Sequence, residues 1–510
     1  MKRYLLGIDA GTTASKVVIF DETGTIIASS TIASSNRMQV VQQGIGFEEF
    51  DVQELWDLIA KCIKITIQKS KIEPQSILGL GVTSFGNGVV FLDESGNAIA
   101  PGCFSQDYRA NDMIAMYKQS GTYEKINKIV RGTLFAGEPG PILRWYKEYR
   151  RDVYDRIGKI FMLKDYIMYR LTGEFVTDAN VFGGSFMTDM DTGEYSKELF
   201  DLYGIEELYG KLPRLYEHPE DIIGSVTKEA AEITGLAEGT FVAAGMMDIL
   251  SSLVGVGGTG EGVITAIAGS WCINETHSSK IIENASSNMP YLHKKEYLNC
   301  SYTGASATNY EWFIQNLGDK AKLTAVYEGK NFYEVFDQFI EQVAIKKDLP
   351  YFQPFIAAPS IHINATAGFS NISAHTSYEE LCYAVVEGIA FIHKYHIQLL
   401  LDAGLPGTLI RLTGGMAKSN VWGQMFTDIM QIPVEIVDCD ETGALGVALA
   451  AGIGVKVYSD YEDAFKKGVK IKLQLEPNDA KKEFYQERYQ EWMTLNTCLL
   501  RYWEENKKLV

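Results

Sequence analysis

The stretch YLLGIDAGTTASKVVIFDETG, residues 4–24, contains two apolar runs separated by a short polar turn. The first run, Tyr4–Ile8, is followed at once by Asp9. The turn contains one glycine and two threonines, and the second run, Val17–Phe20, ends in the turn-forming sequence DETG. Two short apolar runs joined by a glycine-containing turn predict a β-hairpin. The hairpin would place an acid at the end of its first strand.

An acid beside a turn of glycine and hydroxyls suits a hydrated Mg²⁺ next to phosphate groups. Because Mg²⁺ keeps several waters and takes only one or two carboxylates besides phosphate oxygens, Asp9 is the candidate metal residue. Gly11 allows the backbone to approach closely, and Thr12, Thr13 and nearby amides can donate hydrogen bonds to phosphate oxygens. The alternative is an ordinary hairpin in which Asp9 satisfies turn amides. The P-loop pattern GxxxxGK[ST] is absent from the sequence.

A second stretch, EGVITAIAGSWCINETH at residues 261–277, repeats the order of strand, Gly-hydroxyl turn and strand. Two halves that begin alike predict a duplicated α/β domain. Glycines concentrate in LSSLVGVGGTG, so the boundary is predicted near residues 250–258. We expect domains at 1–252 and 253–457, followed by a helical tail at 458–510. Two hairpins that resemble each other by accident are the alternative.

The bulk composition narrows the classes of protein. Hydrophobic residues make up 46% of the 510 residues, and 65 acids against 47 bases give a net charge of −18. A chain this acidic is repelled by a phosphate backbone unless it concentrates Lys and Arg, so no nucleic-acid partner is expected. Seven dispersed cysteines without a CxxC pair predict reduced, buried thiols. The apolar runs are too short for a signal peptide or a membrane span, which predicts a soluble, cytoplasmic protein.

Three further places could carry chemistry. Gly269-Ser270 forms the turn of the second hairpin and could bind the far side of a phosphate chain. Gly414-Gly415 follows a strand and could present amides to a nucleotide. Asp248 follows an apolar strand, where a carboxylate is costly unless it is paired or used. It could contact a metal, accept a proton from an attacking hydroxyl, or cap the helix that follows.

Taken in order along the chain, these pieces resemble the FGGY family of carbohydrate kinases, from about residue 4 to residue 455. The sequences KDYIMYRLTGEFVTD and AAGMMD are similar to two family motifs, and Asp107-Tyr108-Arg109 looks like the family's DxR. The family signature GGGAxSxxWxQxxADxxxxPV appears here as TGGMAKSNVWGQMFTDIMQIPV. The length of this last string makes the resemblance specific.

The resemblance implies an α/β fold of two actin-like (ribonuclease H-like) domains with a cleft between them. It implies that the first domain binds the sugar, that the second binds ATP, and that Mg²⁺ is the metal. Asp248 would be the catalytic base and a second metal contact, and Asp9 would hold Mg²⁺ through water. The residues implied for the nucleotide are Gly11, Thr12, Thr13, Gly269, Ser270, Gly414, Gly415 and Ser419, and those implied for the sugar are Gly86, Asn87, Asp107 and Arg109.

The sugar-binding motifs depart from those of common family members. Glycerol kinases carry Arg-Glu, and typical xylulokinases carry Met-His, where this chain has Gly86-Asn87. The string Ser105–Arg109 and the sequence EPGPILRWYKE at 138–148 look more like the L-xylulose kinase branch, as does Ile249 after the base. The resemblance therefore favours a ketopentose, either L-xylulose or a D-xylulose-like sugar. A polyol kinase of the erythritol or glycerol type and a gluconate-type kinase are the alternatives.

Two other classes of protein share part of this pattern. A non-sugar actin-like ATPase needs the Asp9 turn and the nucleotide glycines, but it needs neither Asp248 nor a set of sugar-binding residues. A sugar-binding regulator would have kept the fold and lost turnover. The kinase is favoured because both acids are present together with candidate sugar residues. A homodimer is compatible with the sequence.

The tail after Pro477 reads as an amphipathic helix. Its apolar side chains recur at steps of three and four, which predicts packing against a domain rather than a cofactor site. The stripe consists of Tyr485, Tyr489, Trp492, Leu495, Leu499 and Tyr502.

Overall fold

The computed structural model describes residues 2–33, 37–42, 45–269, 271–283, 285–357 and 359–505. The chain forms two compact units, each assembled from three separate segments. Unit 1 contains Met1–Thr259, His277–Asn299 and Glu441–Lys470, and unit 2 contains Gly260–Thr276, Cys300–Asp440 and Ile471–Val510. The domain boundaries expected from the sequence stay predictions.

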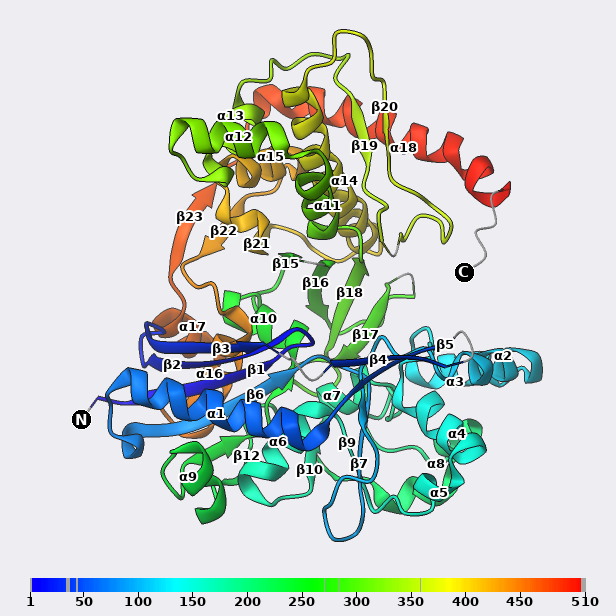
Figure 1. Ribbon diagram of the computed structural model, residues 1–510, viewed down its shortest axis with the longest axis vertical. Helices are drawn as coiled ribbons and strands as arrows, with labels where there is room; N and C mark the ends of the chain where they lie inside the picture. Colours follow the sequence, from blue (N-terminus) through cyan, green and yellow to red (C-terminus); the bar gives the residue numbers. More distant parts are fainter. Residues whose placement is uncertain are drawn as a thin grey trace. The chain divides into compact units, whose positions relative to one another are not determined.

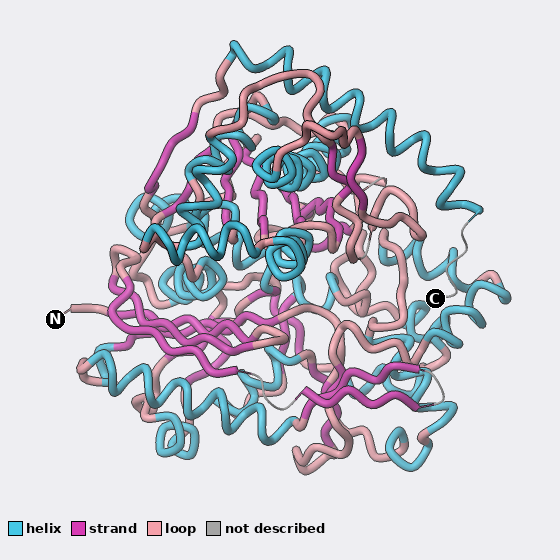
Figure 2. Tube along the Cα trace, turned by 45° about the horizontal axis from the view of Figure 1, so that its top comes forward, coloured by secondary structure: helices cyan, strands magenta, loops and turns pink. Residues whose placement is uncertain are grey.

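Unit 1 is built on a mixed sheet in which β1 is a central strand (Figures 1 and 2). β1 pairs antiparallel with β2 and parallel with β6, and its apolar residues are buried. The strand order is β12-β13-β6-β1-β2-β3, and β14 pairs with β6. The bounds are β1 Tyr4–Ala10, β2 Ala14–Asp21, β3 Ile26–Ala33, β6 Ile77–Ser84, β12 Ile222–Ser225, β13 Phe241–Ala243 and β14 Met246–Met247.

Unit 2 repeats this arrangement. Its strands belong to a sheet with the order β17-β18-β16-β15-β21-β22-β23, in which β15 pairs antiparallel with β16 and parallel with β21. In unit 1, β13 pairs parallel with β6 and β12 pairs antiparallel with β13. In unit 2, β22 likewise pairs parallel with β21 and β23 pairs antiparallel with β22. The predicted duplicated α/β fold is therefore present. The bounds are β15 Val263–Ala268, β16 Cys272–Ser278, β18 Tyr297–Thr303, β21 Leu409–Gly414, β22 Val434–Val437 and β23 Ile471–Leu475.

Short sheets accompany these two. β10 (Val176–Asp178) pairs with β11 (Arg214–Tyr216), and β7 (Val90–Leu92) pairs with β9 (Lys159–Phe161). β4 (Arg37–Gln42), β5 (Ile45–Phe50) and β8 (Gly102–Cys103) form a three-stranded sheet, which positions residues of the predicted sugar site. β19 (Tyr351–Gln353) pairs antiparallel with β20 (Gly368–Ser370), and β17 (Ser287–Pro290) is the edge strand beside β18.

The helices of unit 1 cover its sheet and the adjoining loops (Figure 1). α1 packs its apolar face on β2 and β3, as the spacing of its apolar residues predicts. The bounds are α1 Val52–Ser70, α2 Asn111–Ser120, α3 Thr122–Val130, α4 Pro139–Tyr149, α5 Arg151–Tyr154, α6 Leu163–Thr172, α7 Ala179–Gly184, α8 Lys197–Tyr203, α9 Lys228–Thr234, α10 Asp248–Val256, α16 Thr442–Gly454 and α17 Tyr461–Gly468.

α16 consists of small and apolar residues and packs unusually close to the sheet of unit 1. A Cβ at Gly7 of β1 would lie 1.9 Å from the carbonyl oxygen of Ala444, so only glycine permits this approach. The same helix packs on α10, where a Cβ at Gly446 would lie 1.9 Å from the carbonyl oxygen of Ser251. α16 is thereby held against β1 and α10, the two elements that carry the predicted acids.

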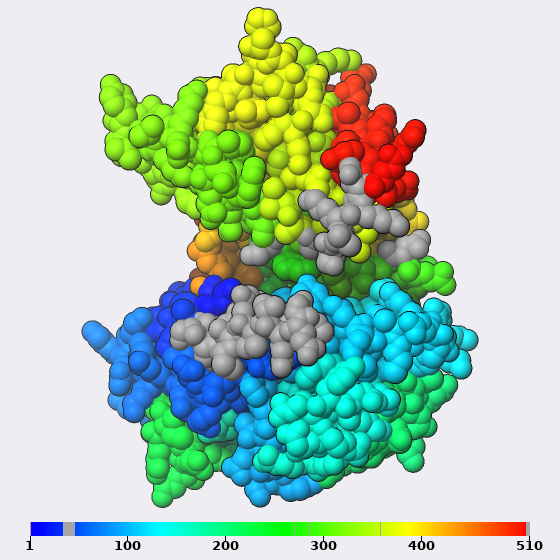
Figure 3. Space-filling view, turned by 45° about the vertical axis from the view of Figure 1, so that its right-hand side comes forward, coloured from blue at the N-terminus to red at the C-terminus, as the bar shows by residue number. Residues whose placement is uncertain are grey.

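In unit 2 the long helix α14 forms the centre of a large apolar core together with α15 and the C-terminal helix α18. Figure 3 shows α18 (red) on the surface of this unit, beside the chain coloured yellow. The predicted apolar stripe of the tail is correct for Tyr485, Tyr489 and Trp492, which are buried, and wrong for Tyr502, which is exposed. Trp503 is buried in its place. The bounds are α11 Ala307–Leu317, α12 Asp319–Glu328, α13 Phe332–Glu341, α14 Tyr378–Asp402, α15 Asn420–Met430 and α18 Lys482–Glu505.

Two composition-based predictions can be compared with the structure. None of the described helices has the length and apolarity that a membrane crossing requires. No disulfide joins the cysteines within the described part of the chain. Five of the seven are buried as predicted, whereas Cys439 is half-buried and Cys498 is exposed.

Candidate active site

Three strands of unit 1 end side by side. β1 and β14 both run parallel to β6, and Asp9 and Met246 both lie opposite Thr83 of β6. Asp248 follows β14 directly as the first residue of α10. In α/β sheets, ligand sites form where the carboxyl ends of parallel strands meet. The fold therefore brings together the two acids that the sequence singled out.

The side chain of Asp9, in β1, packs against the first turn of α16. A Cβ at Gly443 would be 2.8 Å from the Asp9 Oδ2 atom, so the missing side chain makes room for the carboxylate. Burial raises the pKa of Asp9 to about 6, although Lys16 lowers it and Glu441 raises it. Lys16 in turn forms an ion pair with Glu441 at 2.7 Å. A helix N-terminus favours negative charge, which suits both this carboxylate and a phosphate group.

Asp248 is half-buried, and its Oδ1 atom accepts a hydrogen bond of 2.8 Å from the Ile249 amide. The N-cap of α10 is Met247, so Asp248 is not the capping residue that one interpretation of the sequence proposed. Burial, together with the negative charge of Asp9, raises the pKa of Asp248 to about 7. Across the described residues, His, Cys, Asp and Glu form no group of three or more that could hold a metal.

The turn after Asp9 is compact. The Gly11 amide donates to the Ala14 carbonyl at 3.0 Å, so this amide stabilises the turn itself. Thr12 is half-buried and Thr13 is exposed. The two threonines, rather than the glycine amide, are the groups of this turn that a phosphate could reach.

The predicted sugar-binding turn directly follows β6. A Cβ at Gly86 would lie 2.3 Å from the Met247 Cε atom, so this turn packs on the residue that precedes Asp248. Asn87 has a φ of 64° and donates its amide to Ser185 Oγ at 3.0 Å. Among the described residues its buried Oδ1 atom has no hydrogen-bond partner. A buried acceptor without a partner is costly unless a ligand supplies the donor.

Asp107 and Arg109 form a buried pair. Asp107 Oδ1 accepts from the Arg109 amide at 2.9 Å and from Nε at 2.8 Å, and Oδ2 accepts from Arg109 Nη2 at 2.8 Å and from the Glu48 amide at 2.8 Å. The guanidinium of Arg109 also bonds Tyr146 and Glu49 and lies over the ring of Phe47. Asp107 does not cap α2, whose N-cap is Ala110. Their contact with a sugar stays a prediction, because the four acceptor positions of the carboxylate are already used.

Sequence reasoning missed two polar residues near this pair. Within the described chain, Gln106 Oε1 and Glu138 Oε2 are buried without a hydrogen-bond partner. The Gly88 amide donates to the Gly137 carbonyl at 3.1 Å, which ties the turn that carries Asn87 to the loop that carries Glu138. Burial raises the pKa of Glu138 well above its usual range, because a buried carboxylate loses the water that stabilises its charge. For Glu138, the signal that could have found it was the sequence EPGPILRWYKE, which begins with this residue.

The predicted nucleotide residues of unit 2 lie around the equivalent hairpin. Gly269 directly follows β15, and a Cβ there would meet no atom within 4 Å; Ser270 lies outside the described residues. Gly414 has a φ of 92°, and a Cβ there would lie 2.5 Å from the Ala268 carbonyl oxygen. The Gly415 amide donates to that same oxygen at 2.8 Å, so it is not the open amide that the sequence suggested. A role for Gly415 would rest on its lack of a side chain.

Ser419 is the N-cap of α15. Its Oγ atom accepts from the Trp422 amide at 3.0 Å and donates to Asp337 Oδ1 at 2.7 Å. Asp428, also from the signature, is buried and accepts from Gln424 at 2.7 Å. Much of the long signature therefore fixes α15, and the contact of Ser419 with a nucleotide stays a prediction.

Comparison with known proteins identifies the class. The N-terminal domain of the FGGY family of carbohydrate kinases matches residues 4–255, and its C-terminal domain matches residues 264–455. The chain belongs to this family and is a carbohydrate kinase, as the sequence predicted.

Two relatives and one crystal structure illustrate the likeness. A probable L-xylulose kinase of Pasteurella multocida (strain Pm70) is 31% identical over 97% of this chain and 99% of its own. The L-xylulose/3-keto-L-gulonate kinase of Escherichia coli (strain K12) is 28% identical over 98% of each chain. The crystal structure of gluconate kinase from Lactobacillus acidophilus has a TM-score of 0.86 at 21% identity and covers 98% of both chains. This last likeness concerns the fold alone.

Proposed function

We propose that this protein transfers the γ-phosphoryl group of ATP to a hydroxyl of a ketopentose, with L-xylulose as the favoured sugar. The observation that carries the proposal is the meeting of Asp9 and Asp248 at the ends of β1 and β14. The substrate is inferred from the names of the relatives that span the whole chain and from the string Ser105–Arg109. A D-xylulose-like sugar, a polyol and a gluconate-type acid are the alternative acceptors.

In this proposal Asp248 is the general base. The sugar hydroxyl gives its proton to the Asp248 carboxylate, its oxygen bonds to the γ-phosphorus, and the bond to the β–γ bridging oxygen breaks to release ADP. A general base works best when its pKa is close to the working pH, and burial beside Asp9 raises the pKa of Asp248 to about 7. The hydrogen bond from the Ile249 amide leaves the second carboxylate oxygen of Asp248 for the proton.

Asp9 is the residue that would hold Mg²⁺. Within the described ranges no three acids, histidines or cysteines gather around Asp9, which fits an ion that keeps waters and phosphate oxygens as its remaining ligands, with Asp248 as its proposed second contact. When bound, Mg²⁺ supplies positive charge that neutralises the transferring phosphoryl group. Thr12 and Thr13 donate hydrogen bonds to phosphate oxygens, and Gly269, Gly414, Gly415 and Ser419 form the nucleotide side in unit 2.

The proposed sugar site uses three of the buried polar atoms that lack partners in the described chain: Asn87 Oδ1, Gln106 Oε1 and Glu138 Oε2. Vicinal hydroxyls suit such a set, because each hydroxyl both donates and accepts. Burial raises the pKa of Glu138, which favours the protonated carboxyl, the form that can donate a hydrogen bond. Asp107 and Arg109 bond Glu48 and Glu49 of β5 and so support one side of the proposed sugar site, and their charged groups lie within the protein on that side.

The test is a coupled ADP-release assay on a panel of L-xylulose, D-xylulose, erythritol, glycerol and gluconate. The proposal expects ADP release to depend on the acceptor and kcat/KM to be highest for a ketopentose. ADP release at one rate with or without acceptor would instead indicate a non-sugar ATPase. A higher kcat/KM for a polyol or gluconate would keep the kinase and replace the substrate. The cytoplasmic location and the homodimer stay predictions.

A further inference from the structure

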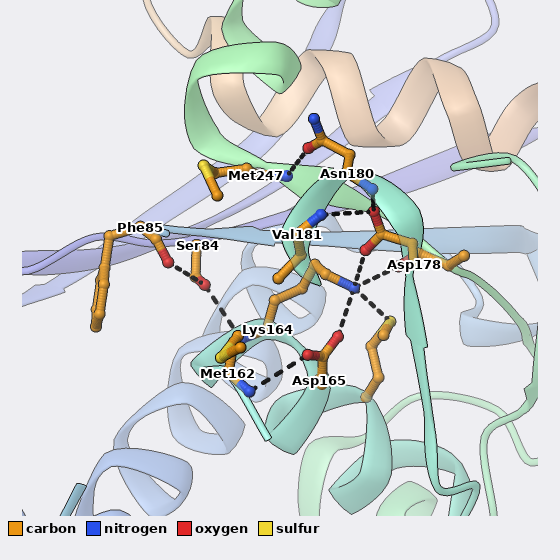
Figure 4. A network of polar contacts seen from close by, with 11 residues as sticks. Ser84, Phe85, Met162, Lys164, Asp165, Asp178, Asn180, Val181 and Met247 are labelled. Carbon is orange, nitrogen blue, oxygen red and sulfur yellow. Dashed lines mark hydrogen bonds and ion pairs between the residues drawn. The ribbon is translucent and has the colours of Figure 1, made fainter. Parts of the chain in front are cut away.

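A buried lysine, Lys164, lies between Asp165 and Asp178 in a polar network that also includes Asn180 and Met247 (Figure 4). Lys164, in the first turn of α6, has no solvent exposure. Its Nζ atom donates to the Ala244 carbonyl at 2.7 Å and forms ion pairs with Asp165 Oδ1 at 2.8 Å and Asp178 Oδ2 at 2.7 Å. The lysine therefore holds the carbonyl that ends the apolar strand before the base.

A second arm of the same network reaches the other end of this segment. Asp178 Oδ1 accepts from the amides of Asn180 at 2.9 Å and Val181 at 3.1 Å, and so caps α7. The Asn180 side chain then accepts from the Met247 amide at 2.9 Å and donates to the Pro290 carbonyl at 2.7 Å. Met247 directly precedes Asp248, so this arm reaches the backbone next to the base.

The network also reaches the turn predicted to bind the sugar. The Lys164 amide donates to Ser84 Oγ at 3.1 Å, and Ser84 Oγ donates to the Phe85 carbonyl at 3.0 Å. Phe85 is followed by Gly86, which packs on Met247. Lys164 thus bonds the Ala244 carbonyl through its side chain and the Ser84 hydroxyl through its own amide.

We infer that Lys164 and Asn180 are positioning residues of the phosphoryl-transfer site, and that they hold the two ends of the segment 244–247 so that Asp248 points at the acceptor hydroxyl. The inference rests on the proposed role of Asp248 as the base. Neither side chain needs to touch a substrate. Each acts on main-chain atoms of a segment that leads from the end of β13 through β14, where Gly245 has a φ of 69°.

Stability alone does not account for such a network. Burial alone would lower the pKa of Lys164, and the carboxylates of Asp165 and Asp178 outweigh this effect and raise it. Buried ion pairs can often be replaced by apolar side chains of similar size without loss of stability. The network bonds the main chain at Ala244 and Met247, next to a carboxylate whose position decides the rate. A shift of about 1 Å in a reacting group can cost about 10²-fold in rate.

Unit 2 offers a matched control. Arg488 and Glu387 also form a buried pair, which joins α18 to α14, and neither belongs to the candidate site. The experiment compares Lys164→Met, Asn180→Ala and Arg488→Met with wild type and with Asp248→Asn. It measures kcat and both KM values, the melting temperature, and amide hydrogen exchange of a peptide that covers residues 244–250.

We expect Asn180→Ala and Lys164→Met to lower kcat by about 10–100-fold while the KM for ATP changes by less than about 3-fold. Exchange in the 244–250 peptide should accelerate more than in the rest of unit 1. Arg488→Met should lower the melting temperature and leave the kcat of the folded protein within about 2-fold of wild type. If Lys164→Met does not fold, Asn180→Ala decides the question, because it removes no charge.

An Asn180→Ala protein with wild-type kcat and unchanged exchange at 244–250 overturns the inference, even if Asp248→Asn is inactive. A lower melting temperature with unchanged kcat also overturns it, because the network would then only stabilise the fold. If instead Asp248→Asn keeps wild-type kcat, the proposed base is wrong. The exchange measurement still reports in that case whether the network holds the segment.

Discussion

The hairpins β1–β2 and β15–β16 share one architecture and differ in chemistry. Each begins with a strand that pairs antiparallel with the next strand and parallel with a third. The second-last residue of β1 is Asp9, which lies opposite Lys16. The second-last residue of β15 is Ile267, which lies opposite Ile273. The duplicated backbone thus provides two similar turns, and only the first carries an acid at this position.

The buried polar groups that hold the main chain near the two candidate turns also differ between the units. In unit 1 the segment before Asp248 is held by a lysine and two carboxylates. In unit 2, Asn274 of β16 bonds His393 at 2.8 Å, and His396 bonds Ser301 at 2.8 Å. Burial, together with the neighbouring His396, lowers the pKa of His393 to about 3, and burial lowers that of His396 to about 4, so both are neutral at pH 7. Charged groups therefore hold the segment before Asp248 in unit 1, whereas neutral histidines bond Asn274 and Ser301 in unit 2.

The largest expected effect follows from the base. Asp248→Asn should lower kcat by about 10²–10⁴-fold, the usual contribution of general-base catalysis, while the KM for ATP changes little. Steady-state kinetics with the best acceptor measure both quantities. A variant with nearly wild-type kcat would show that Asp248 is not the base. One of the two acids that distinguish unit 1 from unit 2 would then have no role in the reaction.

The equivalent positions of the two hairpins give a direct test. Asp9→Ala should lower kcat by about 10²-fold and raise the Mg²⁺ concentration needed for half-maximal rate, because the phosphate charge is then poorly neutralised. Ile267→Ala is the matched change in the second hairpin. It should reduce stability and leave the Mg²⁺ dependence as it is. Equal Mg²⁺ titrations for Asp9→Ala and wild type would make Asp9 a turn residue only.

Because His393 and His396 are buried and neutral, we expect the stability of unit 2 to fall in acid. Their folded pKa values lie below the unfolded value of about 6.5, so the unfolded chain binds more protons and stability falls as the pH drops below that value. Each histidine should cost about 2 kcal/mol between pH 7 and pH 5. Urea unfolding at both pH values measures this loss. A His393→Gln, His396→Gln double variant with the same loss would contradict the assignment.

The smallest effect concerns the sugar alone. Asn87→Gly keeps a residue that tolerates the φ of 64° and removes the carboxamide. It should lower kcat/KM for the sugar by about 10-fold, the value of one lost hydrogen bond, and leave the KM for ATP unchanged. Asn371→Gly, at another left-handed position in unit 2, is the control. An equal effect of both variants on kcat/KM would place Asn87 outside the sugar site.

The sequence was sufficient for the hairpins and the acids, because both are local patterns. An apolar run ending in Asp9 and its later repeat predict the two sheets without knowledge of any distant contact. The bonds that tie the Asp107–Arg109 pair to β5 were out of reach, since Glu48 and Glu49 lie about sixty residues earlier in the chain. The sequence KDY likewise shows a lysine but not that it bonds Ala244, which only the folded chain brings near.

The most direct measurement of the central claim is ³¹P NMR of wild type and Asp248→Asn, each incubated with ATP and Mg²⁺, with and without L-xylulose. We expect wild type to form ADP and a sugar phosphate in equal amounts, and only when the sugar is present. Asp248→Asn should form both at least about 10²-fold more slowly. Release of inorganic phosphate by wild type at the same rate without sugar, or an Asp248→Asn protein that transfers phosphate as fast as wild type, would contradict the central claim.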